Sequence, residues 1–305
     1  MSPKLIFIVG PTCIGKSNLA IKIAKKLKAE IINADSMQVY SNLRILTARP
    51  SNQDTKITKH HLYGYIDGST RYNVATWCKD ASEIINNNFD NKISSIVVGG
   101  TGMYIDKLIN GLSDIPSIPE EYKKKSEKIL LKEGLENFYK IVNQFDKEST
   151  KKINPNDLIR LKRIWEVFMY TNIPMSNWIK NKAKIFLKNP NYFLYLFLPD
   201  RENNYKRVNH RFIKMIKNGA IDEVKNLIEM NFDKTLPIMK AHGVPEICAY
   251  LNNDISIEEC IKKGQKVTRN YVKRQHTWWN STNLKIKQKF KLFPDEIDLK
   301  SINYY

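Results

Sequence analysis

Short apolar runs alternate with amphipathic patterns over the first hundred residues of the chain. Residues 4–9 predict a buried strand, and residues 16–27 repeat apolar side chains at helical spacing. Residues 30–33 and 93–98 predict two further strands. Strands that alternate with helices are typical of a parallel sheet, and such sheets bind ligands beyond the carboxyl ends of their strands.

The pattern changes at about residue 116, where the strand signal stops until residue 189. Apolar side chains recur there at helical spacing, behind a sequence typical of a helix cap, Asn154-Pro155-Asn156-Asp157. The apolar residues of this pattern are Leu158, Leu161, Ile164, Trp165 and Phe168. The stretch 116–189 therefore predicts a helical insertion.

Residues 193–198 form a continuous apolar run, which predicts that the chain returns to the sheet. A long helix is expected over 203–230, and helical patterns continue to residue 279. We therefore expect a discontinuous α/β core, 1–115 and 190–285, with the helical insertion and C-terminal helices, and a tail, 286–305, to which no element is assigned.

Composition adds a charge argument. The 305 residues carry a formal charge of +19, which suits a polyanionic partner such as a nucleic acid, although an organism with Lys-rich proteins explains it equally well. The four cysteines lie far apart in sequence and indicate neither a zinc ribbon nor a disulfide framework. The early apolar run is too short for a signal peptide or a membrane span. We expect a cytoplasmic protein without a membrane partner.

The sharpest motif follows the first predicted strand and leads into the first predicted helix. It matches the phosphate-loop pattern G-x-x-x-x-G-K-[ST] with Gly10, Pro11, Thr12, Cys13, Ile14, Gly15, Lys16 and Ser17. Backbone N–H groups and the helix N-terminus would face phosphates, Lys16 would add a positive charge, and the Ser17 hydroxyl could bind Mg²⁺. The core is thus expected to resemble that of P-loop NTPases.

A phosphate loop does not identify the substrate. The strand at 93–98 leads into Gly99-Gly100-Thr101-Gly102, where an ordinary ATPase or GTPase has an aspartate for Mg²⁺. The segment Asn91-Lys92-Ile93-Ser94 also lacks the aspartate of a guanine-reading N-K-x-D motif. These features disfavour a nucleotide hydrolase but leave a small-molecule kinase open.

Several further motifs, in their order and spacing, resemble those of bacterial tRNA dimethylallyltransferases, the IPP transferase family. Besides the phosphate loop they are Asp35-Ser36-Met37-Gln38-Val39-Tyr40, Thr47-Ala48-Arg49-Pro50, His60-His61-Leu62, Val98-Gly99-Gly100-Thr101-Gly102-Met103-Tyr104, Asn156-Asp157-Leu158-Ile159-Arg160-Leu161 and Thr268-Arg269-Asn270-Tyr271-Val272-Lys273-Arg274-Gln275. The resemblance covers nearly the whole chain. It departs from the family pattern at Arg44, Leu46, His242, Val244, Pro245, His276 and Asn280, so no detailed RNA contact is carried over to those positions.

The resemblance implies transfer of a dimethylallyl group from dimethylallyl diphosphate to the N6 amine of the adenosine 3′ to the anticodon, in tRNAs that read codons beginning with U. Asp35 would accept the proton of the weakly nucleophilic amine. A Mg²⁺ ligand or a helix N-cap is the alternative role for this residue. Such an enzyme is expected to act as a monomer.

Charge that develops on the departing diphosphate would be stabilised by Lys16, Mg²⁺ and arginines. Arg211 is the first candidate and Arg207, four residues earlier on the same predicted helix, its support, although paired surface arginines are commonly only solvated. The Thr101 hydroxyl could donate to the bridging oxygen of the diphosphate or could simply cap a helix.

The tRNA anticodon stem-loop is the expected partner, with its target base turned out of the stack. By resemblance, the residues that contact it are Asp35, Ser36, Met37, Gln38, Lys123, Ile159, Arg160, Leu161, Lys162 and Arg163. Gln38 is the preferred base-edge contact, because an amide both donates and accepts. A basic helix face can also be merely solvated. Besides the prenyltransferase and the small-molecule kinase, a basic RNA-binding NTPase without prenyl chemistry remains a third interpretation.

Two aromatic or imidazole pairs have more than one interpretation. No cysteine or carboxylate cluster accompanies His60 and His61, so a structural role or a place in the donor cleft is expected rather than metal binding. Trp278 and Trp279 could stack on nucleotides or pack a C-terminal helix against the core.

Overall fold

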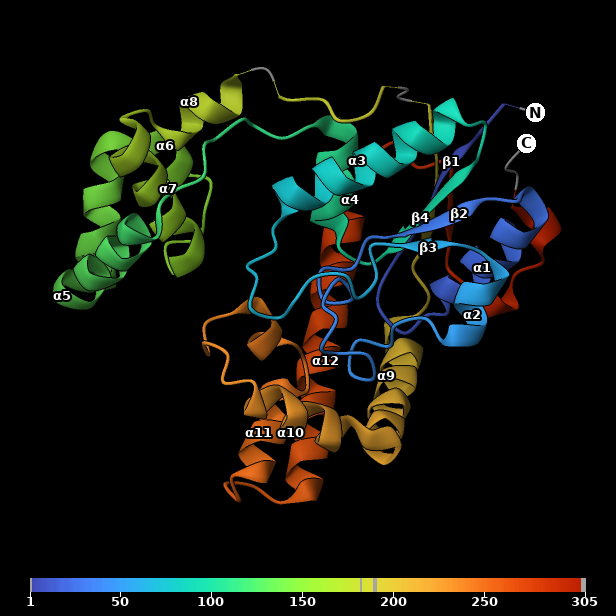
Figure 1. The fold of residues 1–305 in the computed structure, drawn as a ribbon. Helices are drawn as coiled ribbons and strands as arrows, with labels where there is room; N and C mark the ends of the chain where they lie inside the picture. The colour runs from blue at the N-terminus through green and yellow to red at the C-terminus, as the bar shows by residue number, and fades with distance from the viewer. Residues whose placement is uncertain (1, 182, 189–190, 303–305) are drawn as a thin grey trace. The chain divides into compact units, whose positions relative to one another are not determined.

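The computed structural model describes residues 2–181, 183–188 and 191–302. The chain forms two compact units, one made of Met1–Ile109 and Phe186–Tyr305, the other of Asn110–Ile185. Figure 1 shows the helices and strands of each unit.

The first unit is built on a six-stranded parallel sheet with the strand order β3-β2-β4-β1-β5-β6. The strands are β1 (Leu5–Val9), β2 (Glu30–Asn33), β3 (His60–His61), β4 (Ser95–Gly99), β5 (Phe193–Phe197) and β6 (Gln288–Phe290). β1 lies between β4 and β5, and Ile8 aligns with Val98 on one side and Tyr195 on the other. The carboxyl ends of all strands consequently meet at one edge of the sheet.

Both faces of the sheet are covered by helices, as expected for parallel strands. Ile6 and Ile8 pack in a buried cluster with residues of α1 (Lys16–Leu27). Their neighbours Phe7 and Val9 belong to a second cluster, which includes residues of α3 (Val74–Asp90) and α4 (Gly102–Asn110). Successive residues of β1 thus face opposite layers. The short helix α2 (Asn52–Ile57) follows β2 in the chain.

The bounds of three predicted strands were wrong, and two strands were not predicted. The strand predicted over 193–198 ends at Phe197. β1 begins at Leu5 rather than Lys4, and the strand predicted over 93–98 runs over Ser95–Gly99. β3 and β6 were not predicted, and β6 lies in the tail that had no assigned element. Both are short edge strands with few apolar residues, so hydrophobic periodicity cannot reveal them.

A mostly helical region follows β5. It contains α9 (Arg201–Met215), η1 (Ile216–Ala220), α10 (Ile221–Glu229), η2 (Pro237–Lys240), α11 (Val244–Leu251), α12 (Ile257–Asn280), η3 (Pro294–Glu296) and η4 (Leu299–Ser301). The single helix predicted over 203–230 is wrong: Asn218 leaves helical geometry and Gly219 adopts a φ of 98°. Glycine occupies this left-handed region without steric cost, and the chain therefore changes direction there.

The second unit is helical, as its pattern predicted. It consists of α5 (Glu120–Phe145), α6 (Lys147–Thr150), α7 (Leu158–Thr171) and α8 (Met175–Lys180), with α5 interrupted at Gly134. The predicted cap of α7 is confirmed, because the Asp157 side chain accepts from Arg160 N at 3.1 Å. Phe138, Val142 and Ile164 belong to a core of its own. The unit begins and ends a few residues earlier than the predicted insertion.

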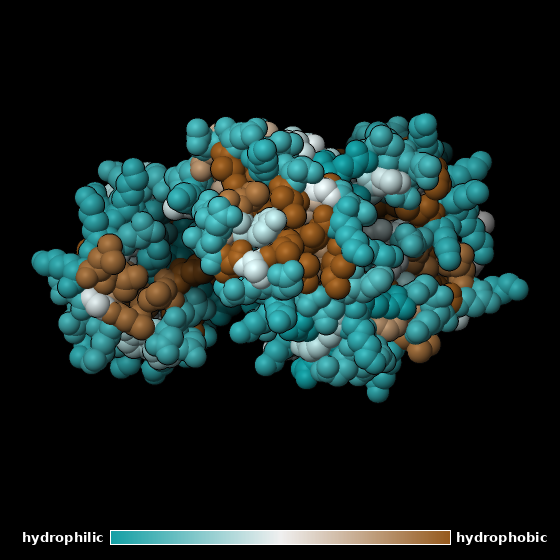
Figure 2. Space-filling view, turned by 90° about the horizontal axis from the view of Figure 1, so that it is seen from below, coloured by the Kyte–Doolittle hydropathy of each residue, from teal (hydrophilic) through white to brown (hydrophobic). Residues whose placement is uncertain are grey.

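One face of the protein shows how polar and apolar residues are distributed on it. On the face drawn in Figure 2, hydrophilic residues surround separate patches of hydrophobic ones. Within the described ranges, no helix combines the length and apolar character that a membrane span requires.

Candidate active site

Three loops meet beyond the carboxyl ends of β1, β2 and β4. The phosphate loop follows β1, residues 34–38 follow β2, and residues 100–102 follow β4. The last two loops are tied directly: Thr101 N donates to Ala34 O at 3.2 Å, and Ser36 N donates to Thr101 Oγ1 at 3.2 Å. Neighbouring strands thus place chemical groups that are distant in sequence in one site.

The phosphate loop has the backbone geometry that anion binding requires. Gly10 has a φ of 147°, and a Cβ at this position would lie 2.2 Å from the carbonyl oxygen of Phe197 on β5. Gly15 forms the left-handed N-cap of α1. The N–H groups in the first turn of a helix have no intrahelical partner and point outward with the positive end of the dipole. The loop can therefore hold phosphate oxygens, with exposed Ser17 at its end.

Lys16 is the half-buried cation of this loop, and its Nζ donates to Pro11 O at 2.5 Å. The pKa of Lys16 is lowered to about 8, mainly by burial, which Asp35 opposes and nearby Arg211 reinforces. An incoming anion would favour the charged form. The loop therefore has a lysine whose protonation is coupled to ligand binding near neutral pH.

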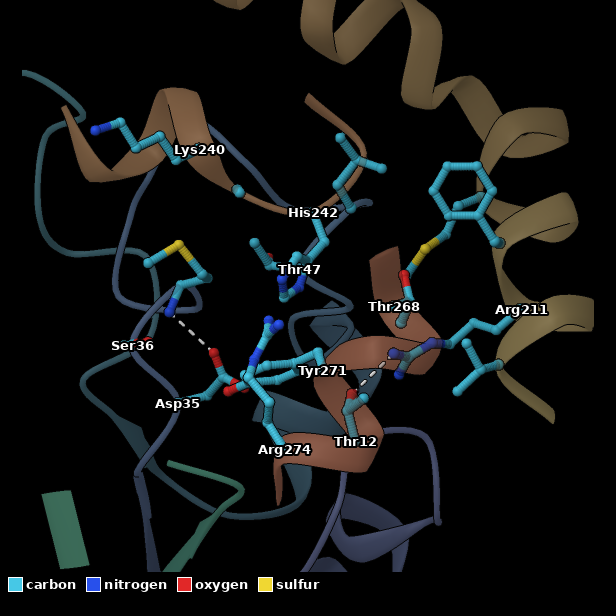
Figure 3. A pocket seen from close by; sticks show the side chains of 16 residues that line it. Thr12, Asp35, Ser36, Thr47, Arg211, Lys240, His242, Thr268, Tyr271 and Arg274 are labelled. Carbon is cyan, nitrogen blue, oxygen red and sulfur yellow. Dashed lines mark hydrogen bonds between the residues drawn. The ribbon is translucent and has the colours of Figure 1, made fainter. Parts of the chain in front are cut away.

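Two cavities adjoin the three loops. One, of about 340 Å³, is lined by the phosphate loop together with Gly99 and Gly100. The other, of about 220 Å³, is drawn in Figure 3, and its lining residues include the apolar Val208 and Phe212. Thr12, Asp35 and Arg211 line both cavities. These three residues would thus lie next to both an anion at the phosphate loop and an organic group in the second cavity.

Asp35 is half-buried and held by its own backbone. Its Oδ1 accepts from Met37 N at 2.9 Å and from Gln38 N at 3.3 Å, and its N–H donates to Asn33 Oδ1 at 2.8 Å. No hydrogen bond to its Oδ2 is found within residues 2–181, 183–188 and 191–302. One carboxylate oxygen therefore caps the turn while the other is available to a ligand. Ser36 and Met37 line the 220 Å³ cavity.

Gln38 has a fixed side chain. Its Nε2 donates to Thr47 O at 2.8 Å and to Ala48 O at 3.1 Å. The loop that carries these carbonyls is held in turn by Glu223, whose carboxylate accepts from Ile45 N at 2.7 Å. With both amide hydrogens used, Gln38 can offer only its Oε1 to a base, which suits an exocyclic amine.

The two predicted arginines have different surroundings. Arg211 Nη2 donates to Thr12 Oγ1 at 2.8 Å, at the shared wall of the cavities. Arg207 instead makes a bidentate pair with Asp295, at 2.9 and 3.0 Å, and its guanidinium lies 3.6 Å from the centre of the Phe293 ring. Arg207 does not line either of the two cavities. The structure thus brings Arg211 to the site and ties Arg207 to the C-terminal segment.

Thr101 lies between the loops at the start of α4 and does not line either cavity. Its side chain also interacts with that of Tyr271, whose pKa is raised mainly by burial. Tyr271, His242 and Arg274 line the 220 Å³ cavity near Asp35 (Figure 3). None of these three had an assigned role at the site, although Tyr271 and Arg274 stand in the family motif at 268–275.

The predicted RNA contacts in the helical unit have unequal exposure. Ile159 is 81% exposed, whereas the side chain of Leu161 is fully buried in the core and is not available to RNA. Arg160 is exposed beside Asp157, and half-buried Lys162 pairs with Glu127. Arg163 is half-buried, which lowers its pKa, and Lys123 pairs with Glu120 at 2.7 Å.

The histidine pair, His60 and His61, and the tryptophan pair, Trp278 and Trp279, make contacts within the protein. His61 on β3 has its Nε2 2.7 Å from Glu30 on β2. Trp279 is 1% exposed, and the ring of Trp278 lies where a Cβ of Gly102 would be. In the described part of the chain, no group of three or more His, Cys, Asp or Glu side chains could hold a metal ion.

The sequence model of the IPP transferase family matches residues 38–282. A tRNA dimethylallyltransferase from Pelagibacter ubique is 43% identical over 90% of this chain and 88% of its own length. One from Ehrlichia canis is 40% identical over 91% of both chains.

Solved structures agree with these relatives. The full-length tRNA isopentenylpyrophosphate transferase from Bacillus halodurans superimposes with a TM-score of 0.67 and 28% identity, covering 98% of this chain and 92% of that one. A eukaryotic dimethylallyltransferase acting on tRNA gives a TM-score of 0.77 and 30% identity, covering 91% and 70%. The fold, the site and the sequence agree that the chain belongs to the IPP transferase family.

Proposed function

We propose that the protein is a tRNA dimethylallyltransferase that prenylates N6 of the adenosine 3′ to the anticodon. The observation that carries the proposal is the position of Asp35, whose carboxylate lies in the shared wall of an anion-binding cavity and a second, partly apolar one. A general base at that position can reach an amine that attacks a carbon attached to a bound diphosphate. Membership of the IPP transferase family supports the same reaction.

The donor, dimethylallyl diphosphate, places its diphosphate at the phosphate loop. Lys16 and Arg211 supply positive charge there, and Lys16 interacts electrostatically with both Asp35 and Arg211. Ser17 has the hydroxyl that would hold Mg²⁺ beside the phosphate oxygens. When bound, Mg²⁺ neutralises charge on the diphosphate. Arg207 acts indirectly: it pairs with Asp295, and Asp295 lies beside Gly15 of the phosphate loop.

In the transfer, the adenine N6 nitrogen forms a bond to the allylic carbon while the carbon–oxygen bond to diphosphate breaks. Oδ2 of Asp35 accepts one proton of the amine, and the released diphosphate keeps the electron pair of the broken bond. Lys16 and Arg211 stabilise the charge that grows on this leaving group. The Thr101 hydroxyl accepts from Ser36 N and so orients the two loops. Because Thr101 lines neither cavity, donation from it to the diphosphate would require the donor to reach beyond the phosphate-loop cavity.

The tRNA partner contributes the base. Residues 35–38 hold it, with Gln38 Oε1 accepting from the exocyclic amine, while the helical unit binds the anticodon stem-loop. The enzyme acts as a monomer in the cytoplasm, where its tRNA substrates are found. The relatives named as tRNA dimethylallyltransferases support a tRNA substrate.

Replacing the proposed base should slow chemistry far more than binding. Asp35→Asn keeps an oxygen for the N–H groups of Met37 and Gln38 but cannot accept the proton, and Asp35→Ala removes both functions. We expect both variants to lower the single-turnover rate at saturating tRNA by on the order of 10² to 10⁴. Normal chemistry combined with weaker tRNA binding would make Asp35 an anchor for the base instead.

Transfer should require no nucleoside triphosphate. Radiolabelled dimethylallyl diphosphate, Mg²⁺ and unmodified tRNA should suffice for product, because the phosphate loop binds the donor itself. ATP added in place of the donor should give no product. A strict requirement for ATP in the complete reaction would contradict this assignment of the loop.

Donor affinity should depend on pH through Lys16. Its pKa of about 8 in the free enzyme lies below its ordinary value, and a bound diphosphate raises it, so binding takes up a proton above about pH 8. Affinity should hold steady below that pH and fall above it. Lys16→Arg stays charged and should lose this dependence. Titration calorimetry in buffers of different ionisation enthalpy measures the uptake, and equal uptake by both proteins would exclude Lys16 as its source.

The helical unit should supply salt-sensitive affinity rather than chemistry. Replacing Arg160, Lys162 and Arg163 with Gln should weaken tRNA binding and flatten its salt dependence, with a slope change of up to roughly 0.7–0.9 for each phosphate that the variant no longer neutralises. Arg160 should account for the largest share, because it is the most exposed of the three. The single-turnover rate at saturating tRNA should stay nearly unchanged.

The matched control removes the same charge elsewhere in this unit. Lys132, Lys140 and Lys152 carry local ion pairs and have largely exposed side chains, and their triple Gln variant should have little effect on filter binding across the salt series. If both triple variants bind tRNA as the wild type does, the RNA must be held by Arg269, Lys273 and Arg274 of α12 instead.

A further inference from the structure

Gln275 makes two hydrogen bonds that join different loops of the site. It lies on α12 and is 4% exposed. Its Oε1 accepts from Thr12 N at 2.8 Å, and its Nε2 donates to Gly100 O at 3.0 Å. The partners lie 263 and 175 residues away in sequence. A single buried amide therefore links the phosphate loop to the loop that follows β4.

The hydrogen bond with Thr12 fixes the first part of the phosphate loop. The Thr12 N–H points to Gln275 and is thus withdrawn from the set of N–H groups available to phosphate. The Thr12 hydroxyl meanwhile accepts from Arg211 at 2.8 Å. Since backbone and side chain of Thr12 are both held, Gln275 indirectly fixes where Arg211 meets the loop.

The hydrogen bond from Gln275 to Gly100 is possible because residue 100 is a glycine and has no side chain. A Cβ at Gly100 would lie 2.2 Å from Nε2 of Gln275 and 3.1 Å from Gly10 O. The glutamine amide thus occupies the narrow space between the two loops. Truncation of Gln275 would leave the half-buried N–H of Thr12 and the buried C=O of Gly100 without their partners, which favours rearrangement of the loops.

Gln275 is oriented away from the surface that its neighbours present. Lys273 and Arg274 are exposed on the same helix, whereas both polar atoms of the Gln275 amide are used internally. The residue is therefore poorly placed to recognise RNA directly. Tyr271, one turn earlier, interacts with both Thr101 and Gln275, so this inward side of α12 reaches the phosphate loop and the loop after β4 together.

We propose that Gln275 is a positioning residue for the donor diphosphate: it holds the phosphate loop and the loop after β4 at the separation that diphosphate binding requires. The proposal rests on the proposed function for the identity of the donor, but the link that Gln275 forms acts on any diphosphate at the loop.

The test replaces Gln275 with Met, which has similar length but cannot form either hydrogen bond. Gln265→Met is the matched control, because Gln265 lies on the same helix and its Nε2 donates to a backbone carbonyl, Asn209 O, at 3.1 Å. Binding of inorganic pyrophosphate with Mg²⁺ is measured by calorimetry, tRNA binding by filter assay, and folding by thermal unfolding.

We expect Gln275→Met to weaken pyrophosphate binding by about 10-fold and to raise the KM for dimethylallyl diphosphate by a similar factor, the usual effect of losing a buried hydrogen bond. Affinity for tRNA should change by less than about 2-fold, and Gln265→Met should bind pyrophosphate as the wild type does. Equal pyrophosphate affinity in the two variants overturns the proposal, as does a loss confined to tRNA binding.

Measuring pyrophosphate binding tests the role of Gln275 independently of whether the protein transfers a prenyl group. A wild-type protein that transfers no prenyl group to tRNA would refute the transferase assignment, while a selective loss of pyrophosphate affinity in Gln275→Met would still support the positioning role. A wild-type protein that does not bind pyrophosphate would overturn the positioning role as well.

Discussion

Parallel pairing of β2, β4 and β1 is the constraint on which the site depends. Because the three strands run in the same direction, their carboxyl ends meet at one edge, and the loops that follow them are neighbours despite their distance in sequence. Asp35 and the phosphate loop are brought together in this way. Ladder hydrogen bonds and burial on both faces make the edge rigid, so the loops can hold groups in defined positions.

The charge at this edge is predominantly positive, with a single acidic side chain among the cations that line the two cavities in the described part of the chain. Lys16 and Arg211 attract an anion, yet burial and mutual repulsion disfavour the charged lysine in the free protein, and Asp35 offsets part of that effect. A bound diphosphate would offset the electrostatic repulsion between Lys16 and Arg211. Among the described residues that line the two cavities, Asp35 is the one acidic group, and it can accept a proton at their shared wall.

Sequence predicted the parts of this arrangement that depend on local pattern. α1 and β2 have the predicted bounds because a strand, a glycine-rich turn and an amphipathic helix each have a distinct signal. The edge strands and the break at Gly219 lack such signals.

Local sequence patterns could not predict the long-range contacts in the site. Nothing local in the sequence indicates that Gln275 meets Thr12 or that Arg207 pairs with Asp295. Leu161 differs, because its helical spacing indicated a buried position that the family resemblance overrode. Family resemblance identified the segments involved, but only packing decides which side chain of a segment faces the site and which faces the protein interior.

In the proposed complex, Asp35 stands between a diphosphate at the phosphate loop and the amine of an unstacked adenine. A crystal structure with an anticodon stem-loop and a non-reactive analogue of dimethylallyl diphosphate tests it most directly. We expect the diphosphate to lie against Lys16 and Arg211, with the adenine N6 within hydrogen-bonding distance of Asp35 Oδ2. An adenine bound away from Asp35, or a diphosphate outside the phosphate loop, would contradict it.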